Sequence, residues 1–102
     1  MIAPTNFVRI VNRTRYSVEA STLLASDSYW DGHNHERHGR NTFLYRTPKG
    51  AYFTVALSRW QGEDDTLTPC TLDEAVDLFE GRLREHAVSY EDAFPNVEVG
   101  DA

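Results

Sequence analysis

Apolar and polar residues alternate along residues 42–58 on both sides of a short turn. Residues 47–50 (Thr-Pro-Lys-Gly) suit that turn, because proline presets φ at its second position and glycine accepts the left-handed geometry at its end. A three-residue loop at 48–50 predicts a hairpin in which Tyr45 pairs with Phe53. Side chains alternate along a strand, so five apolar residues share one face, which we expect to be the core face: Phe43, Tyr45, Phe53, Val55 and Leu57.

The opposite face of this hairpin is mixed, and we expect it to be partly exposed: Leu44, Arg46, Tyr52 and Thr54. Residues 6–11 are rich in β-branched and aromatic side chains and predict a first strand, which leads into a polar turn at 12–15. Two interpretations fit residues 16–30: a helix over 17–25 capped by Ser17, or a turn and then a strand over 22–30 in which Leu23, Ala25 and Tyr29 alternate. We favour the strand, because the Ser-Asp-Ser run at 26–28 is poor helix interior.

A helix is predicted over residues 72–86. Thr71 and Glu74 form a capping box, in which each side chain serves the other residue's backbone amide. The apolar stripe of this helix has helical spacing: Leu72, Ala75, Val76, Phe79 and Leu83. Ser89 can cap one more short turn over 90–94, which Pro95 ends. Residues 31–41 and 59–68 are polar and are expected to be loops.

These elements predict an α+β fold in one domain, residues 1–102, with a loosely ordered tail at 96–102. The expected architecture is a small antiparallel sheet of three to four strands, with one amphipathic helix packed on one face and a short C-terminal helical turn. We expect the helix to cover the face that carries Phe43 and Phe53, with Phe79 buried between the two layers.

Charge and cysteine content narrow the functional classes. The formal net charge is −6, with +3 in residues 1–50 and −9 in residues 51–102, so direct binding to nucleic acid is not expected. The single cysteine, Cys70, excludes an intramolecular disulfide and favours a reducing, cytoplasmic location. The N-terminus lacks the basic and apolar regions of a signal peptide, and no apolar run is long enough to predict a membrane helix. No cofactor motif is present.

Three histidines in the 31–41 loop are the sharpest candidates for chemistry. His33, His35 and His38 can supply imidazole nitrogens to zinc, nickel or copper, and Asp31 and Glu36 lie beside them in sequence. The pattern matches no strong metal template, so a solvated loop is the simpler interpretation. Cys70 precedes a helix cap, where the helix dipole can activate a thiol, but no histidine is spaced to act as its base.

A partner-binding surface is the leading functional hypothesis. The predicted surface comprises the 31–41 loop and four aromatic or cationic residues at strand ends or on the hairpin: Trp30, Arg46, Tyr52 and Trp60. Arg9, Arg13 and Arg15 predict a small basic patch near the first strand, with Arg46 as a possible neighbour. An alternative is an acidic inhibitor of an enzyme that acts on nucleic acid, built from these residues: Glu63, Asp64, Asp65, Asp73 and Asp77.

The hairpin and helix motifs resemble a loose group of small bacterial proteins carried by plasmids, integrative elements and phages. The resemblance spans about residues 15–94. It is carried by residues 44–47 (Leu-Tyr-Arg-Thr), 49–53 (Lys-Gly-Ala-Tyr-Phe), 69–75 and 90–94. The shared motifs are structural, so they identify no catalytic residue. The resemblance implies an accessory protein of a mobile element or phage. We therefore expect a non-enzymatic protein that binds another macromolecule. A metal-binding protein is the first alternative and the acidic inhibitor the second, and an edge strand could pair two copies into a homodimer.

Overall fold

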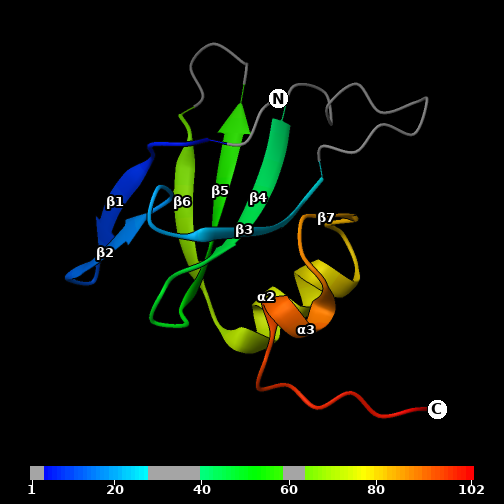
Figure 1. Ribbon diagram of the computed structural model, residues 1–102. Helices are drawn as coiled ribbons and strands as arrows, with labels where there is room; N and C mark the ends of the chain where they lie inside the picture. Colours follow the sequence, from blue (N-terminus) through cyan, green and yellow to red (C-terminus); the bar gives the residue numbers. More distant parts are fainter. Residues whose placement is uncertain (1–3, 28–39, 59–63) are drawn as a thin grey trace.

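The computed structural model describes residues 4–27, 40–58 and 64–102 and shows an α+β protein (Figure 1). Two sheets form, where a single sheet of three to four strands was predicted. The larger has five strands, all antiparallel to their neighbours, in the order β6-β5-β4-β3-β7. The smaller is the two-stranded ribbon β1–β2. The bounds are β1 Val8–Val11, β2 Thr14–Ser17, β3 Thr22–Ser26, β4 Arg40–Arg46, β5 Tyr52–Ser58, β6 Thr66–Cys70, α2 Leu72–Glu80, β7 Glu85–His86 and α3 Tyr90–Ala93.

The β4–β5 hairpin confirms the predicted register. Tyr45 pairs with Phe53 and Phe43 pairs with Val55. The turn closes with the amide of Thr47 donating to the carbonyl of Ala51 at 2.8 Å. Gly50 has a φ of +90°, the left-handed geometry that the turn chemistry predicted. Phe43 and Phe53 therefore do share one face of the sheet, and both are buried.

The sheet is buried on both faces, and the helices cover the face opposite to the predicted one (Figure 1). The ribbon-side core consists of Val18, Phe43, Tyr45, Phe53 and Val55. The helix-side core consists of Leu24, Ala25, Leu44, Tyr52, Ala75, Phe79, Leu83, Ala93 and Phe94. Phe79 is buried as predicted, but it packs in the helix-side core and not against Phe53.

The β1–β2 ribbon explains why the prediction chose the wrong face. Phe7 and Tyr16 pack on the ribbon-side core, and the Tyr16 ring meets Phe53 edge-on with centroids 5.5 Å apart. The ribbon therefore covers the aromatic face, and the helices cover Leu44 and Tyr52, which are buried and not partly exposed. The turn is tighter than the predicted 12–15: Asn12 and Arg13 both have positive φ, so β2 begins at Thr14. The first strand begins at Val8 and not at residue 6.

A β-bulge in β3 distributes its side chains between the two cores. Leu23 pairs with Tyr45, but the next pair is Ala25 with Leu44, so Leu24 is an extra residue. Leu23 consequently packs on the ribbon side, whereas Leu24 and Ala25 lie in the helix-side core. The strand interpretation of this segment is confirmed, but strict alternation of Leu23 and Ala25 on one face is wrong. Tyr29 lies outside the described residues.

Helix α2 begins as predicted and ends earlier. Both capping-box bonds are present: Glu74 N donates to Thr71 Oγ1 at 3.1 Å, and Thr71 N donates to Glu74 Oε1 at 2.9 Å. The predicted end at 86 is wrong, because the helix stops at Glu80 with Gly81 as its C-cap. Glycine is a poor helix former, so the chain turns there, and Leu83 reaches the core from the turn. The short helix α3 confirms the prediction, with Ser89 as its N-cap.

Strand β6 was missed, since residues 59–68 were expected to be a loop. Thr66–Cys70 pairs with β5 along its whole length and places Pro69 opposite Phe53. Proline is tolerated there because β6 forms an edge of the sheet. The chain turns at residues 95–96 after α3, where the amide of Val97 donates to Phe94 O at 3.1 Å, and residues 97–102 adopt neither helix nor strand.

Candidate functional site

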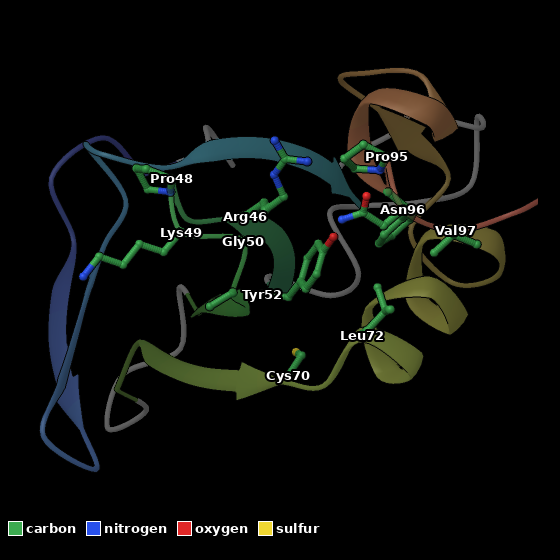
Figure 2. A pocket seen from close by; sticks show the side chains of 12 residues that line it. Arg46, Pro48, Lys49, Gly50, Tyr52, Cys70, Leu72, Pro95, Asn96 and Val97 are labelled. Atoms are coloured by element: carbon green, nitrogen blue, oxygen red, sulfur yellow. The ribbon is translucent and has the colours of Figure 1, made fainter.

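A cleft of about 430 Å³ opens where β5 and β6 separate (Figure 2). Tyr52 and Cys70 form the last pair between these strands. Beyond that pair the β5 chain turns back into the hairpin loop, while the β6 chain continues into α2. Residues 94–97, at the end of α3 and just after it, complete the lining of the cleft. Twelve residues line it: Arg46, Pro48, Lys49, Gly50, Ala51, Tyr52, Cys70, Leu72, Phe94, Pro95, Asn96 and Val97.

The floor of the cleft is largely apolar. Tyr52 is only 9% exposed, and its hydroxyl donates to the carbonyl of Ala93 at 3.1 Å. Its ring packs on Phe94 with centroids 5.5 Å apart. Leu72, at the first turn of α2, leaves 43% of its surface exposed at the cleft, although it was predicted to belong to the buried stripe. An exposed leucine beside two buried aromatic rings suits an apolar side chain of a ligand.

Arg46 contributes a positioned cation at the rim. Its Nη1 donates to Asp92 O at 3.1 Å and lies 3.5 Å from Ala93 O, so strand β4 and helix α3 together hold the guanidinium. Within the described residues, no acceptor contacts its Nε or Nη2. Figure 2 shows the guanidinium beside Tyr52, on the hairpin side of Asn96. The N–H groups of Nε and Nη2 can donate two parallel hydrogen bonds to the two oxygens of a carboxylate.

The charged groups that line the cleft are both cationic. Lys49, in the hairpin turn, is exposed and joins Arg46, while no Asp or Glu belongs to the lining among the residues that the structure describes. The whole chain carries a formal charge of −6. The cleft is therefore a local exception on an acidic protein, and it favours an anionic ligand.

Cys70 lies in this cleft as a half-buried thiol. Burial raises its pKa, the nearby Glu74 carboxylate raises it further, and hydrogen bonding with Thr54 lowers it. The thiolate is the nucleophilic form, so a raised pKa makes Cys70 a poorer nucleophile than its place before a helix cap suggests. Cys70 thus contributes shape to the cleft and offers a chemical probe of it.

The cleft brings together two of the four predicted partner-binding residues. Arg46 and Tyr52 lie on neighbouring strands as a cross-strand pair. Trp30 and Trp60 lie outside the described residues, as do the three predicted metal ligands His33, His35 and His38. Within the described ranges, no group of three or more His, Cys, Asp or Glu side chains is placed to hold a metal ion.

The described acidic residues lie in two groups along the chain, and Arg46 lies apart from the predicted basic patch. Asp64 and Asp65 precede β6, whereas Asp73 and Asp77 come after it on α2, so a five-residue strand of roughly 17 Å separates the two pairs. Glu63 lies outside the described residues. On the basic side, Arg9 lies over the Phe7 ring at 4.2 Å in the ribbon segment. The ribbon and Arg46 are on opposite faces of the sheet, so Arg46 is not its neighbour.

The sequence analysis missed the C-terminal wall of the cleft, which consists of Phe94 and residues 95–97. Phe94 was predicted to end a short helical turn, and residues 95–97 were assigned to the end of that turn and to a loose tail. The Tyr52–Phe94 contact joins segments that are 42 residues apart, and no local pattern reports such a contact. The exposed position of Leu72 could have been found from its place at the first helical residue, where the side chain lies at the edge of the apolar stripe.

A second polar cluster lies at the opposite end of β4. Asp27 is 3% exposed, and its Oδ1 accepts from Thr42 N at 2.8 Å and from Asn41 Nδ2 at 3.1 Å. Arg82 Nη2 lies 3.9 Å from its Oδ2 and donates to Thr42 Oγ1 at 2.8 Å. These bonds tie the ends of β3 and β4 to the turn after α2. We interpret this cluster as a structural brace, since its hydrogen bonds are satisfied within the protein.

Comparison with known proteins found no matching family model, no matching curated protein and no matching solved structure. In the part of the chain that the structure describes, no helix is long and apolar enough to cross a bilayer.

Proposed function

We propose that this chain is a cytoplasmic, non-enzymatic binding protein whose cleft takes up an extended segment of a protein partner. The observation that carries the proposal is the cleft itself: a fixed guanidinium at the rim, beside an apolar floor formed by Tyr52, Phe94 and Leu72. A segment that places an aliphatic side chain next to a carboxylate would satisfy both features.

The net charge of −6 supports a protein ligand over nucleic acid, because a single pair of cations neutralises too few phosphates to hold a polyanion. The raised pKa of the Cys70 thiol supports a binding role over thiol catalysis. The resemblance of the hairpin and helix motifs to small proteins of plasmids, integrative elements and phages is the basis for proposing an accessory role in such an element.

Cys70 permits a direct test, because it is the single cysteine of the chain and lines the cleft. Short fluorescent peptides that alternate acidic and aliphatic residues should bind the protein and slow the reaction of Cys70 with a soluble thiol reagent. A basic peptide of the same length should do neither.

Two variants of exposed apolar residues make the test specific. Leu72→Glu places a carboxylate in the cleft and should weaken peptide binding at least about tenfold, because like charges meet there. The same change at Val8, which is 41% exposed on the β1–β2 ribbon against 43% for Leu72, should leave binding unchanged. Equal binding by wild type and Leu72→Glu, or no binding by any acidic–aliphatic peptide, would overturn the proposal.

A further inference from the structure

The chain itself contains a segment with the chemistry that the cleft favours. Residues 98–101 read Glu-Val-Gly-Asp, so an aliphatic side chain stands between two carboxylates. Val99 is 69% exposed, the most exposed of the large hydrophobic residues in the described part of the chain. We call residues 98–101 the acidic tail. Burial of the exposed valine side chain is favourable. The two carboxylates of the acidic tail would pair with cations, which are outnumbered by acidic residues on this negatively charged protein.

The acidic tail starts at the rim of the cleft but leads away from it. Asn96 and Val97 line the cleft, and the amide of Val97 is held by Phe94 O at 3.1 Å. Figure 2 shows the chain leaving past Val97 on the side away from Lys49, and Figure 1 shows it continuing away from the hairpin and both helices. The direction of the chain at Val97 therefore presents the acidic tail to a neighbouring molecule and not to its own cleft.

We propose that the acidic tail of one copy occupies the cleft of a second copy, so that the protein forms a reciprocal dimer. This inference rests on the proposed function and names a partner for the same cleft. Val99 fills the space beside Leu72 and Tyr52. The Glu98 carboxylate accepts hydrogen bonds from Nε and Nη2 of the Arg46 guanidinium.

The length of the acidic tail limits the geometry of the dimer. Four extended residues span at most roughly 14 Å, so the two clefts must face each other across a two-fold axis. Each cleft then receives the other copy's tail, and the interface is closed. Two such short contacts bury less surface than a standard stable interface. The dimer should therefore be a weak, transient complex, with a dissociation constant on the order of micromolar or above, and should dissociate on dilution.

In-trans complementation gives the sharpest test of this exchange. Leu72→Glu spoils the cleft and leaves the tail intact, whereas Val99→Glu spoils the tail and leaves the cleft intact. Each variant alone should dimerise at least about tenfold more weakly than wild type by sedimentation equilibrium. An equimolar mixture can still make one tail–cleft contact, and should associate more strongly than either variant alone. Val8→Glu, on the ribbon, is the matched control and should dimerise like wild type.

Circular dichroism and the denaturant midpoint check that every variant folds. Leu72 and Val99 are both exposed in the wild-type structure, so neither substitution opens a cavity in the core. An acid at the first turn of α2 also favours the helix, so Leu72→Glu is expected to fold. Salt provides a second readout. Raising ionic strength from about 0.1 M to about 1 M shortens the screening length from about 10 Å to about 3 Å and should weaken the dimer.

Three outcomes decide the proposal. A concentration-dependent dimer with recovery in the mixture supports it. A chain that stays monomeric up to about 1 mM, while its cleft still binds acidic–aliphatic peptides, overturns the dimer and leaves the proposed function standing. A dimer that is indifferent to Leu72→Glu and Val99→Glu overturns the tail exchange, and if peptide binding is equally indifferent, it overturns the proposed function as well.

Discussion

The imidazole of His86 stacks on the ring of Phe79, with centroids 3.8 Å apart and an angle of 12° between the planes. The same imidazole contacts the backbone carbonyl of Phe79, with Nε2 2.8 Å from the oxygen. One residue of β7 thus covers the end of α2 in two ways: it shields the last buried aromatic ring and donates to a carbonyl near the C-terminus of the helix. Nε2 must carry the proton, because a carbonyl oxygen only accepts.

We predict that the two contacts of His86 can be separated by substitution. His86→Phe keeps a ring over Phe79 and loses the hydrogen bond, at a cost of about 1 kcal/mol. His86→Ala loses both the stack and the hydrogen bond, at a cost of about 1–3 kcal/mol. Chemical denaturation measures both values. Glu85→Ala, at the neighbouring exposed position of β7, is the control and should change stability by less than about 0.5 kcal/mol. Equal losses for the two His86 variants would show that the stack contributes nothing.

The two cores should respond independently to substitution. Phe53 belongs to the ribbon-side core and Phe79 to the helix-side core, with the sheet between them. A double-mutant cycle on Phe53→Leu and Phe79→Leu should therefore give a coupling energy within about 0.5 kcal/mol of zero. Phe79 and Phe94 touch edge to face with centroids 5.4 Å apart, so their cycle should give a larger coupling, from about 0.5 kcal/mol upward. A large coupling between Phe53 and Phe79 would contradict the two-core arrangement.

Gly50 should resist replacement for conformational reasons alone. Its φ is +90°, and a Cβ built there meets nothing within 4 Å, so strain rather than a clash opposes a side chain. Gly50→Ala should cost about 1–2 kcal/mol in the free energy of unfolding, since the left-handed conformation is unfavourable for an L-residue. Gly50→Asn should cost less, because asparagine tolerates this region. If alanine and asparagine are equally tolerated, the turn does not depend on the conformation that we describe.

Alkaline pH should destabilise the protein through Tyr45. Burial raises the pKa of this phenol from its ordinary value of 10.0 to about 12, and its hydroxyl donates to Pro4 O at 3.2 Å. Between about pH 10 and pH 12 the unfolded chain loses a proton that the folded chain retains. The contribution of Tyr45 to the free energy of unfolding is therefore fully present below about pH 10 and is lost as the pH rises to about 12. Tyr45→Phe should make this fall shallower in denaturant unfolding across that range, and an unchanged slope would contradict the assignment.

The histidine hypothesis remains a prediction with its own test. If His33, His35 and His38 bind a metal, Zn²⁺ or Ni²⁺ should raise the melting temperature, because a ligand that binds only the folded state stabilises it. Replacement of all three by alanine should abolish that rise. His86→Ala controls for metal binding at the histidine outside this loop. No thermal shift with excess metal would remove the hypothesis.

Local patterns predicted the local structure well. The turn chemistry at 47–50 fixes the hairpin register, and the capping box at Thr71 marks the start of α2. The early end of α2 at Gly81 and the strand β6 were misread from local sequence, whereas the other failures come from contacts that no local pattern records. The apolar face of the hairpin was assigned to the helix, because the alternation of Phe43 and Phe53 shows which side chains share a face and not which element covers it. The bulge at Leu24 likewise appears only once β4 is in place.

The candidate site was predicted in part for the same reason. Arg46 and Tyr52 came from the hairpin, whose geometry is local, and they do lie together in the cleft. The C-terminal wall of the cleft depends on the packing of Phe94 against Tyr52, two residues that are 42 positions apart in the chain. That contact depends on the return of α3 to the helix side of the sheet, while the β1–β2 ribbon packs on the other side. No local residue pattern reports on which side an element packs.

The position of Pro69 in β6 affects how the sheet terminates. A proline in an edge strand offers no amide hydrogen to an approaching chain, and at the other border β7 is only two residues long. Growth of the sheet by stacking strand upon strand between molecules is thereby discouraged at both borders. The two border strands of the five-stranded sheet therefore resist the addition of a further strand, and this lowers the tendency of the folded chain to polymerise into fibrils.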